Sequence, residues 1–415
     1  MFYPKTPFYG KGLLLENGIL KVNSHELDKL LSWLCKTPRI TTYRINTLRT
    51  SVADYKLKLE TKLSALYGSS APLVYGLKEI PEMLCISPLD TTTDNKYDDC
   101  RKELIVDTSC GAAVLRGAHI YAPGVLAMES GTQLHELVNV FADLPGKCKR
   151  GTSTRYDCNE KIFIGVGEVL MQRHQLYNNK EQPASGIAVR MQTNVSGVPT
   201  LGDLSDGDAL LQNLPSMVCV RVLDPQPGER ILDMCAAPGN KTTHMAELIC
   251  NRGTIIALDN SASRVRSMTE KLANYTCITA HQFDATKAWD DNNDIDSIAP
   301  PFASGSFDRI LLDAPCSGLG NRPQLWLRPG GILVYSTCTV TEAECEEIVS
   351  WALRKYTELQ LVDATPKLGA PGLPLPDLEA AQCDLLQRFG PSRENRMQNL
   401  DTVGFFIAKF QKTSD

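Results

Sequence analysis

Apolar and polar positions follow first a helical period and then a strand period in the N-terminal part of the chain. Leucines recur at helical spacing over residues 27–34, behind a potential Ser24 cap, and residues 52–66 repeat the helical pattern. Between these segments, residues 41–47 alternate in the manner of a half-buried strand. Residues 1–100 are therefore predicted to form an α+β region, and no catalytic motif stands within it.

The pattern changes near residue 101 and again near residue 205. In residues 101–195, short apolar runs are separated by glycine and polar clusters, which predicts a small β-barrel or sandwich. In residues 205–415, strand-like runs alternate with helical stretches; the runs are residues 229–235, 254–259, 309–314 and 331–336. This alternation predicts an α/β fold, a doubly wound parallel sheet with helices on both faces.

Composition fits a protein of two or three domains without a membrane segment. The chain has 415 residues, of which 43% are hydrophobic and 22% charged, and no apolar run approaches the roughly 18 residues of a membrane span. The first residues lack the features of a signal peptide, and the 14 cysteines include no Cys-x-x-Cys. We therefore expect reduced thiols and a cytoplasmic location. The net charge of −5 leaves room for a local basic patch, and residues 146–155 carry four positive side chains and no acid.

The turn after the first strand of the 205–415 region has the character of a ligand site. Residues 234–239 are mostly small, and a helix follows, so backbone N–H groups at its start are available to a ligand. The turn matches neither the P-loop nor the Gly-x-Gly-x-x-Gly spacing. Counting the aspartate that ends this strand, four acids follow successive strands, the later three being Asp259, Asp284 and Asp313. Acids at this edge of a doubly wound sheet suit a nucleoside without a pyrophosphate, although each could instead cap a helix.

Two cysteines stand just past the ends of the last two strands. Cys316 follows the run that ends at Asp313, and Cys338 follows the run ending in Tyr-Ser-Thr. Both thiols are expected at the ligand edge of the sheet, which indicates nucleophilic catalysis beside a bound nucleoside. The competing interpretation is a pair of unreactive thiols.

The ordered motifs resemble those of Nol/Nop/Sun-domain RNA (cytosine-5) methyltransferases. They are LDMCAAPGNKT, ALD, FDATKA, LLDAPCSGLG, VYSTCT and the closing residues 401–410. Residues 105–124 resemble a PUA RNA-binding domain inserted before the catalytic domain, an arrangement similar to that of the sixth Sun-family member, which modifies tRNA. The resemblance implies an N-terminal RNA-binding region at 1–100, a PUA-like domain at 101–195 and a methyltransferase domain at 205–415.

The resemblance also implies a reaction and a set of residues. The chain is expected to use S-adenosyl-L-methionine to methylate carbon 5 of cytosine 72 at the 3′ end of the tRNA acceptor stem, as a monomer, with other RNA as a further possible partner. Cys338 is the implied nucleophile toward carbon 6, Cys316 assists product release, and Lys241 and Asp313 contact the base. The implied cofactor residues are Cys235, Ala236, Ala237, Pro238, Gly239, Asn240, Lys241, Asp259 at the ribose, Asp284 near the adenine, and Asp313. The implied RNA contacts are Arg116, Tyr121, Lys149 and Arg150, the last two having a solvated turn as the alternative.

The sequence departs from the family pattern at two places. Asn240 replaces a glycine, and we expect it to tolerate a positive φ there. The connection at residues 315–330 holds three prolines and three glycines, so its longest stretch free of both has only five residues. Neighbouring parallel strands need a crossover of a dozen or more residues, which is usually a helix. The alternative function is accordingly an RNA-binding protein with an impaired catalytic domain. A DNA cytosine-5 methyltransferase is a weaker third interpretation, because those enzymes lack the Thr-Cys thiol.

Overall fold

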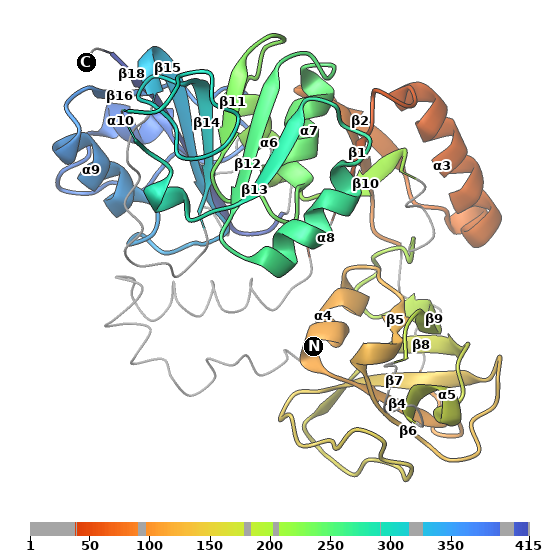
Figure 1. Ribbon diagram of the computed structural model, residues 1–415. Helices are drawn as coiled ribbons and strands as arrows, with labels where there is room; N and C mark the ends of the chain where they lie inside the picture. The colour runs from red at the N-terminus through yellow and green to blue at the C-terminus, as the bar shows by residue number, and fades with distance from the viewer. Residues whose placement is uncertain are drawn as a thin grey trace.

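The computed structural model describes residues 38, 40–89, 97–177, 184–201, 207–290, 292–314, 327–390 and 402–413, with residues 327–331 as backbone only. The helix predicted at residues 27–34 lies outside these ranges, as does Cys316. Three sheets organise the described residues, and Figure 1 shows them from the side.

The first sheet is antiparallel, with the order β10-β1-β3-β2. Its strands are β1 (Thr41–Ile45), β2 (Val74–Leu77), β3 (Ile80–Ile86) and β10 (Ala209–Leu211). Helix α3 (Val52–Tyr67) begins behind the Ser51 cap and buries Tyr55 and Leu59. The fourth strand, β10, comes from beyond residue 205, so the chain returns to this sheet before it enters the largest one.

The second sheet has six strands in the order β5-β9-β8-β7-β4-β6. Its strands are β4 (Glu103–Val106), β5 (Ile120–Tyr121), β6 (Val125–Met128), β7 (Leu137–Asp143), β8 (Lys161–Val169) and β9 (Ile187–Asn194). Helix α4 (Thr108–Leu115) lies close to β7 because a Cβ at Gly111 would stand only 2.7 Å from that of Ala142. Arg116 follows α4 directly as its C-cap. A β-rich region within residues 101–195 is thus confirmed.

The third sheet has the order β13-β12-β11-β14-β15-β18-β16, and β17 also pairs with β18. Five strands run parallel: β11 (Arg230–Asp233), β12 (Thr254–Asp259), β13 (Ile278–Gln282), β14 (Phe307–Asp313) and β15 (Leu327–Thr337). Three antiparallel partners follow: β16 (Leu359–Val362), β17 (Gln387–Phe389) and β18 (Phe405–Lys412).

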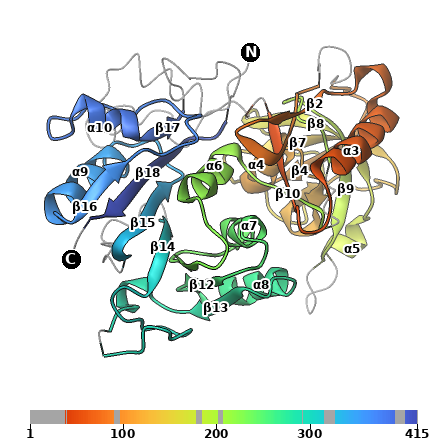
Figure 2. The same cartoon turned by 90° about the horizontal axis from the view of Figure 1, so that it is seen from above.

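Helices cover both faces of this third sheet. Ile231 and Val334 pack toward α6 (Leu214–Leu223) and α7 (Asn240–Leu248), and Ala257 packs toward α8 (Ala262–Leu272). The alternate positions Leu232 and Leu333 pack toward α9 (Glu346–Lys355) and α10 (Ala380–Leu385). Figure 2 shows α6 and α7 on one side of the strands and α9 and α10 on the other. The predicted α/β, Rossmann-like doubly wound fold is confirmed, because side chains alternate between two apolar cores.

The first sheet is attached to α7 through buried polar groups. Glu82 of β3 accepts from Arg221 of α6 at 2.9 Å and lies 2.7 Å from Nε2 of His244 on α7. Arg44 of β1 donates to the backbone carbonyl of Asn240 and to Thr243 Oγ1, the latter at 2.8 Å. The helix that follows the ligand turn is therefore held from outside its own sheet.

Strands β14 and β15 are direct parallel neighbours, with Asp313 opposite Ser336. The chain crosses from one to the other between residues 313 and 327, the short connection noted in the sequence. Among the helices that the structure describes, none combines the length and the apolar character needed to cross a bilayer.

Candidate active site

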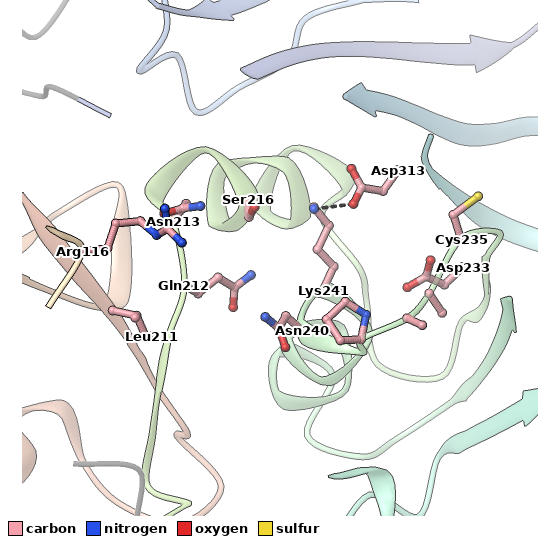
Figure 3. Close-up of a pocket in the computed structure, with 13 residues that line it drawn as sticks. Arg116, Leu211, Gln212, Asn213, Ser216, Asp233, Cys235, Asn240, Lys241 and Asp313 are labelled. Carbon is pink, nitrogen blue, oxygen red and sulfur yellow. Dashed lines mark hydrogen bonds and ion pairs between the residues drawn. The ribbon is translucent and has the colours of Figure 1, made fainter. Parts of the chain in front are cut away.

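A cavity of about 250 Å³ opens at the carboxyl-terminal edge of the parallel strands. Figure 3 shows the turn after β11, the start of α6 and the end of α4 meeting around it. The lining residues are Arg116, Leu211, Gln212, Asn213, Ser216, Asp233, Cys235, Ala236, Ala237, Pro238, Asn240, Lys241 and Asp313. Eight of these residues are among those named from the sequence, so the predicted cofactor turn, the base-contacting pair and one RNA-binding candidate meet at one place.

The turn between β11 and α7 is shaped by Gly239. Gly239 is the N-cap of α7 with φ 93°, in the left-handed region that favours glycine. A Cβ at this position would also lie 3.0 Å from Met268 Cγ. The expectation for Asn240 is wrong: Asn240 is the first residue of α7 and is not among the residues with positive φ. Its side chain is tolerated because the first turn of a helix has no need of glycine.

Asp233 is a buried carboxylate at the end of β11. Its Oδ2 accepts from Thr242 Oγ1 at 2.7 Å, whereas Oδ1 has no hydrogen-bond partner in the part of the chain that the structure describes. Burial raises the pKa of the Asp233 carboxyl from its ordinary 3.8 to about 7. Asp233 was counted in the ring of strand-end acids but not chosen as a site residue, because nothing in the pattern distinguished it from a helix-capping acid.

Lys241 and Asp313 form an ion pair inside the cavity. Lys241 Nζ lies 2.6 Å from Asp313 Oδ2, and its side chain is 12% exposed. Burial lowers the pKa of the Lys241 ammonium, but the neighbouring Asp313 carboxylate together with Cys219 and Asp233 outweighs this effect, so the pKa is raised. Ser336 Oγ donates to the other oxygen, Asp313 Oδ1, at 2.8 Å. These contacts link α7, β14 and β15 at one edge of the sheet.

Cys338 follows directly after β15, two residues beyond Ser336, and is exposed. It is not among the residues that line the cavity, so the nucleophilic role expected of this thiol stays a prediction. Cys235 also lines the cavity, but burial raises its pKa to about 12, so at neutral pH it is a thiol rather than a thiolate. Of the two cysteines that follow strand ends, only Cys338 is within the described residues.

The two remaining acids lie outside the cavity lining. Asp259 is 4% exposed, accepts from the backbone N–H of Ala237 at 3.3 Å and pairs with Arg264 at 3.2 Å. Asp259 therefore holds the backbone of the predicted cofactor turn without lining the cavity itself. Asp284 caps a short 3₁₀ turn by accepting from Thr286, whose hydroxyl and N–H hold the pKa of the Asp284 carboxyl below its usual range.

The four RNA-binding candidates occupy different environments. Arg116 lines the cavity, and Tyr121 of β5 is 52% exposed. Lys149 is exposed. Arg150, in contrast, donates to the backbone carbonyls of Pro123 and Val125 at 2.7 and 3.0 Å and to that of Ala122 at 3.3 Å. Much of its donor capacity is therefore used in holding the β5–β6 segment.

Gln212, Asn213 and Ser216 line the cavity although sequence reasoning did not select them. Gln212 is placed there because β10, which it follows directly, pairs with β1 across more than 160 residues of chain. No local pattern around a lone glutamine signals such a position.

Comparison with known proteins gives one consistent result. A family model described as 16S rRNA methyltransferase RsmB/F matches residues 220–324. The mouse tRNA (cytosine(72)-C(5))-methyltransferase NSUN6 is 38% identical, covering 99% of this chain and 96% of the mouse protein. The tRNA (cytosine(72)-C(5))-methyltransferase of Pyrococcus horikoshii is 30% identical, covering 94% of each chain. The crystal structure of NSun6 from Pyrococcus horikoshii with SFG matches with a TM-score of 0.69 and 27% sequence identity. The match covers 94% of this chain and 95% of that chain.

The length of the alignment also shows that this chain lacks segments that a relative has. The alignment with the mouse protein runs over 460 positions, more than the 415 residues of this chain, so the mouse protein has segments without a counterpart here. The family match ends at residue 324, within the connection between β14 and β15. Because similarity to the two tRNA methyltransferases extends over nearly the whole length of each, the chain belongs to the NSUN6 family of tRNA cytosine-5 methyltransferases.

Proposed function

We propose that this chain methylates carbon 5 of a cytosine in tRNA with S-adenosyl-L-methionine as the methyl donor. The observation that carries the proposal is the cavity in which the turn after β11 meets the Lys241–Asp313 pair, with Ser336 of β15 donating to Asp313. The names of the relatives support tRNA and cytosine 72 as the target. They favour an enzyme over an RNA-binding protein with an impaired catalytic domain.

The residues present fit this cofactor. The turn is built from small residues, and Cys235, Ala236, Ala237 and Pro238 line the cavity, so the backbone leaves room for a ligand. The oxygen Oδ1 of Asp233 lies buried beside the turn and lacks a partner within the described residues, as an acceptor reserved for a ligand would. Residues 235–241 with Asp313 would hold the methionine part of the cofactor, with Asp259 toward the ribose and Asp284 toward the adenine. When bound, the cofactor supplies an electrophilic methyl group on a sulfonium sulfur.

The residues of the chain supply the activation of the base. Carbon 5 of cytosine is a weak nucleophile, and addition of the Cys338 thiolate to carbon 6 raises the electron density at carbon 5. Lys241 and Asp313, as a charged pair lining the cavity, would contact the polar edge of the ring and stabilise the charge that this addition creates. Once carbon 5 carries the methyl group, loss of its proton to a base or to solvent and expulsion of Cys338 as a thiolate restore the aromatic ring, and Cys316 would assist that release.

The second sheet is proposed as a PUA domain that receives the acceptor end of tRNA. Its α4 ends at Arg116, which already lines the cavity, and Tyr121 and Lys149 present exposed side chains. The target base would leave the acceptor helix to reach the cavity. The proposed domains are residues 1–100, 101–195 and 205–415, with β10 completing the sheet of the first. A monomer and a cytoplasmic location stay predictions.

The experiment that tests the function measures methyl transfer to tRNA transcripts from labelled S-adenosyl-L-methionine, followed by mapping of 5-methylcytosine. The assay compares this chain with a version whose 315–330 connection is replaced by the corresponding segment of the mouse relative. We expect methylation at cytosine 72 by the second protein at least. Absence of transfer by both proteins, with both folded, would contradict the proposal.

A further inference from the structure

We infer that Gln212, oriented by Arg44, is a specificity-determining residue that donates a hydrogen bond to the N3–O2 edge of the target cytosine. This inference rests on the proposed function and adds a residue to it. The cavity geometry motivates it, because Gln212 presents a fixed donor there whose partner is not part of the described protein.

Three of the four polar groups of Gln212 are already bound. Its backbone N–H donates to the Thr42 carbonyl at 3.2 Å, and its own carbonyl accepts from Thr42 Oγ1 at 2.5 Å. Its side-chain Oε1 accepts from Arg44 Nη1 at 2.5 Å. The residue is only 5% exposed, so both its backbone and its side chain are held in place.

The fourth group, the amide nitrogen, is directed to the cavity. Arg44 can only donate, so the oxygen of the Gln212 amide must face it and the NH₂ group must face away. Figure 3 shows this nitrogen on the side of the cavity toward Lys241. Nε2 has no hydrogen-bond partner among the residues that the structure describes. An unmatched buried donor is costly, so its presence in a cavity indicates a ligand acceptor.

The position of Gln212 favours the base as the source of that acceptor. Figure 3 shows Gln212 between Arg116, which comes from the second sheet, and Lys241, on the side of the cavity away from Cys235 of the cofactor turn. Cytosine offers acceptors at N3 and O2, while uracil carries a proton on N3. A donor at this edge therefore discriminates cytosine from uracil. It also stabilises the negative charge that thiolate addition to carbon 6 places on N3 and O2.

The binding test uses acceptor-stem RNA with cytosine, 3-deazacytosine or 2-thiocytosine at the target position. The first analogue lacks the N3 acceptor, and the second weakens the O2 acceptor. Wild-type protein should bind one of the analogues about two- to tenfold more weakly than cytosine RNA, and Gln212→Leu should lose that difference. Fluorescence anisotropy measures this without turnover. Equal discrimination by both proteins would overturn the inference.

The rate test separates base recognition from a structural role. Gln212→Glu keeps an acceptor for Arg44 and should slow single-turnover methylation at saturating RNA by about two- to tenfold, while the affinity for S-adenosyl-L-methionine and the melting temperature stay near wild type. Gln212→Leu should slow methylation by a similar factor and also lower the melting temperature, because it removes the acceptor of Arg44. Thr243→Val is the matched control, since it removes a contact of Arg44 without touching the Gln212 amide. Loss of cofactor affinity with unchanged discrimination between the RNAs would assign the donor to the cofactor instead. Failure of the wild-type protein to methylate would count against the proposed function alone, because the binding test still reads the contact.

Discussion

Replacing Arg44 with methionine should be among the most destabilising single changes in the described residues. Arg44 is 3% exposed, and its Nε lies 2.9 Å from Oε2 of Glu247, while Nη2 donates to Oε1 of the same residue at 3.0 Å. The variant leaves the Glu247 carboxylate, 2% exposed, without its counter-charge. It also removes the donors to Gln212 and to the Asn240 carbonyl at the start of α7.

The size of the effect follows from burial. Breaking a buried ion pair by removing one partner costs about 3–5 kcal/mol, because the remaining charge stays desolvated. Two features of this site place the cost near the lower value, about 3 kcal/mol. The Tyr275 hydroxyl still donates to Glu247 at 2.7 Å, and burial already raises the pKa of the Glu247 carboxyl, so Glu247 can take up a proton.

Urea unfolding followed by circular dichroism measures the change, with a double-mutant cycle to isolate the pair. Arg44→Met combined with Glu247→Gln should recover about 1–2 kcal/mol of the loss, since no buried charge is left alone. Arg49→Met is the matched control, because Arg49 pairs with Asp208 at 2.9 Å but is 48% exposed, and its loss should cost about 0.5 kcal/mol or less. If Arg44→Met were no more costly than Arg49→Met, the buried network would not be what attaches the first sheet to α7.

Three further predictions concern the site. Cys338→Ala should abolish both methyl transfer and the covalent complex with 5-fluorocytosine RNA, whereas Cys316→Ala should accumulate a protein–RNA adduct on a denaturing gel; the opposite pattern would exchange the roles of the two thiols. Lys149→Glu should weaken tRNA binding, and the loss of affinity should be smaller at high salt than at low salt. Arg150→Glu should in addition lower the melting temperature, because Arg150 donates to three backbone carbonyls. If Lys149→Glu caused no loss of affinity at either salt concentration, Lys149 would not belong to the interface. The pKa of the Asp233 carboxyl is raised to about 7, so the folded protein holds this proton more tightly than the unfolded chain does. The resulting contribution to stability is complete below about pH 4 and is lost as the pH rises through 7. Asp233→Asn should therefore flatten that part of the melting-temperature profile between about pH 5 and 8.

The sequence predicted the parts of the fold that follow from local periodicity. Successive side chains of the strands around Ile231 and Ile310 alternate between two apolar cores, a pattern that can be recognised in the sequence. The small residues of the turn before α7 can be recognised in the same way. The pairing of β10 with β1 is different, because it joins segments far apart and no turn signal announces it. Gln212 depends on that pairing, so it was not predicted.

The same distinction applies to single residues. The sequence placed Lys241 and Asp313 at one edge because both follow parallel strands, and their 2.6 Å contact confirms the placement. It left open whether Asp284 would bind a ligand or act as a cap, and it did not predict that Arg150 would donate to backbone carbonyls, since both outcomes depend on contacts that only the folded chain defines. Charge and position along a strand therefore predict where a side chain is found more reliably than whether it is available to a ligand.

The short connection between β14 and β15 affects the chemistry through the geometry of its two ends. Its first end is fixed by Asp313, which is held by Lys241 and Ser336, and its second by β15, which pairs with β14 and β18. The contacts that define this edge of the site are thus made among α7, β14, β15 and β18. The connection does carry Cys316. We therefore expect a shortened connection to affect product release more than the attack by Cys338, so that this chain, compared with one carrying the longer segment, would form the covalent complex at a similar rate and resolve it more slowly.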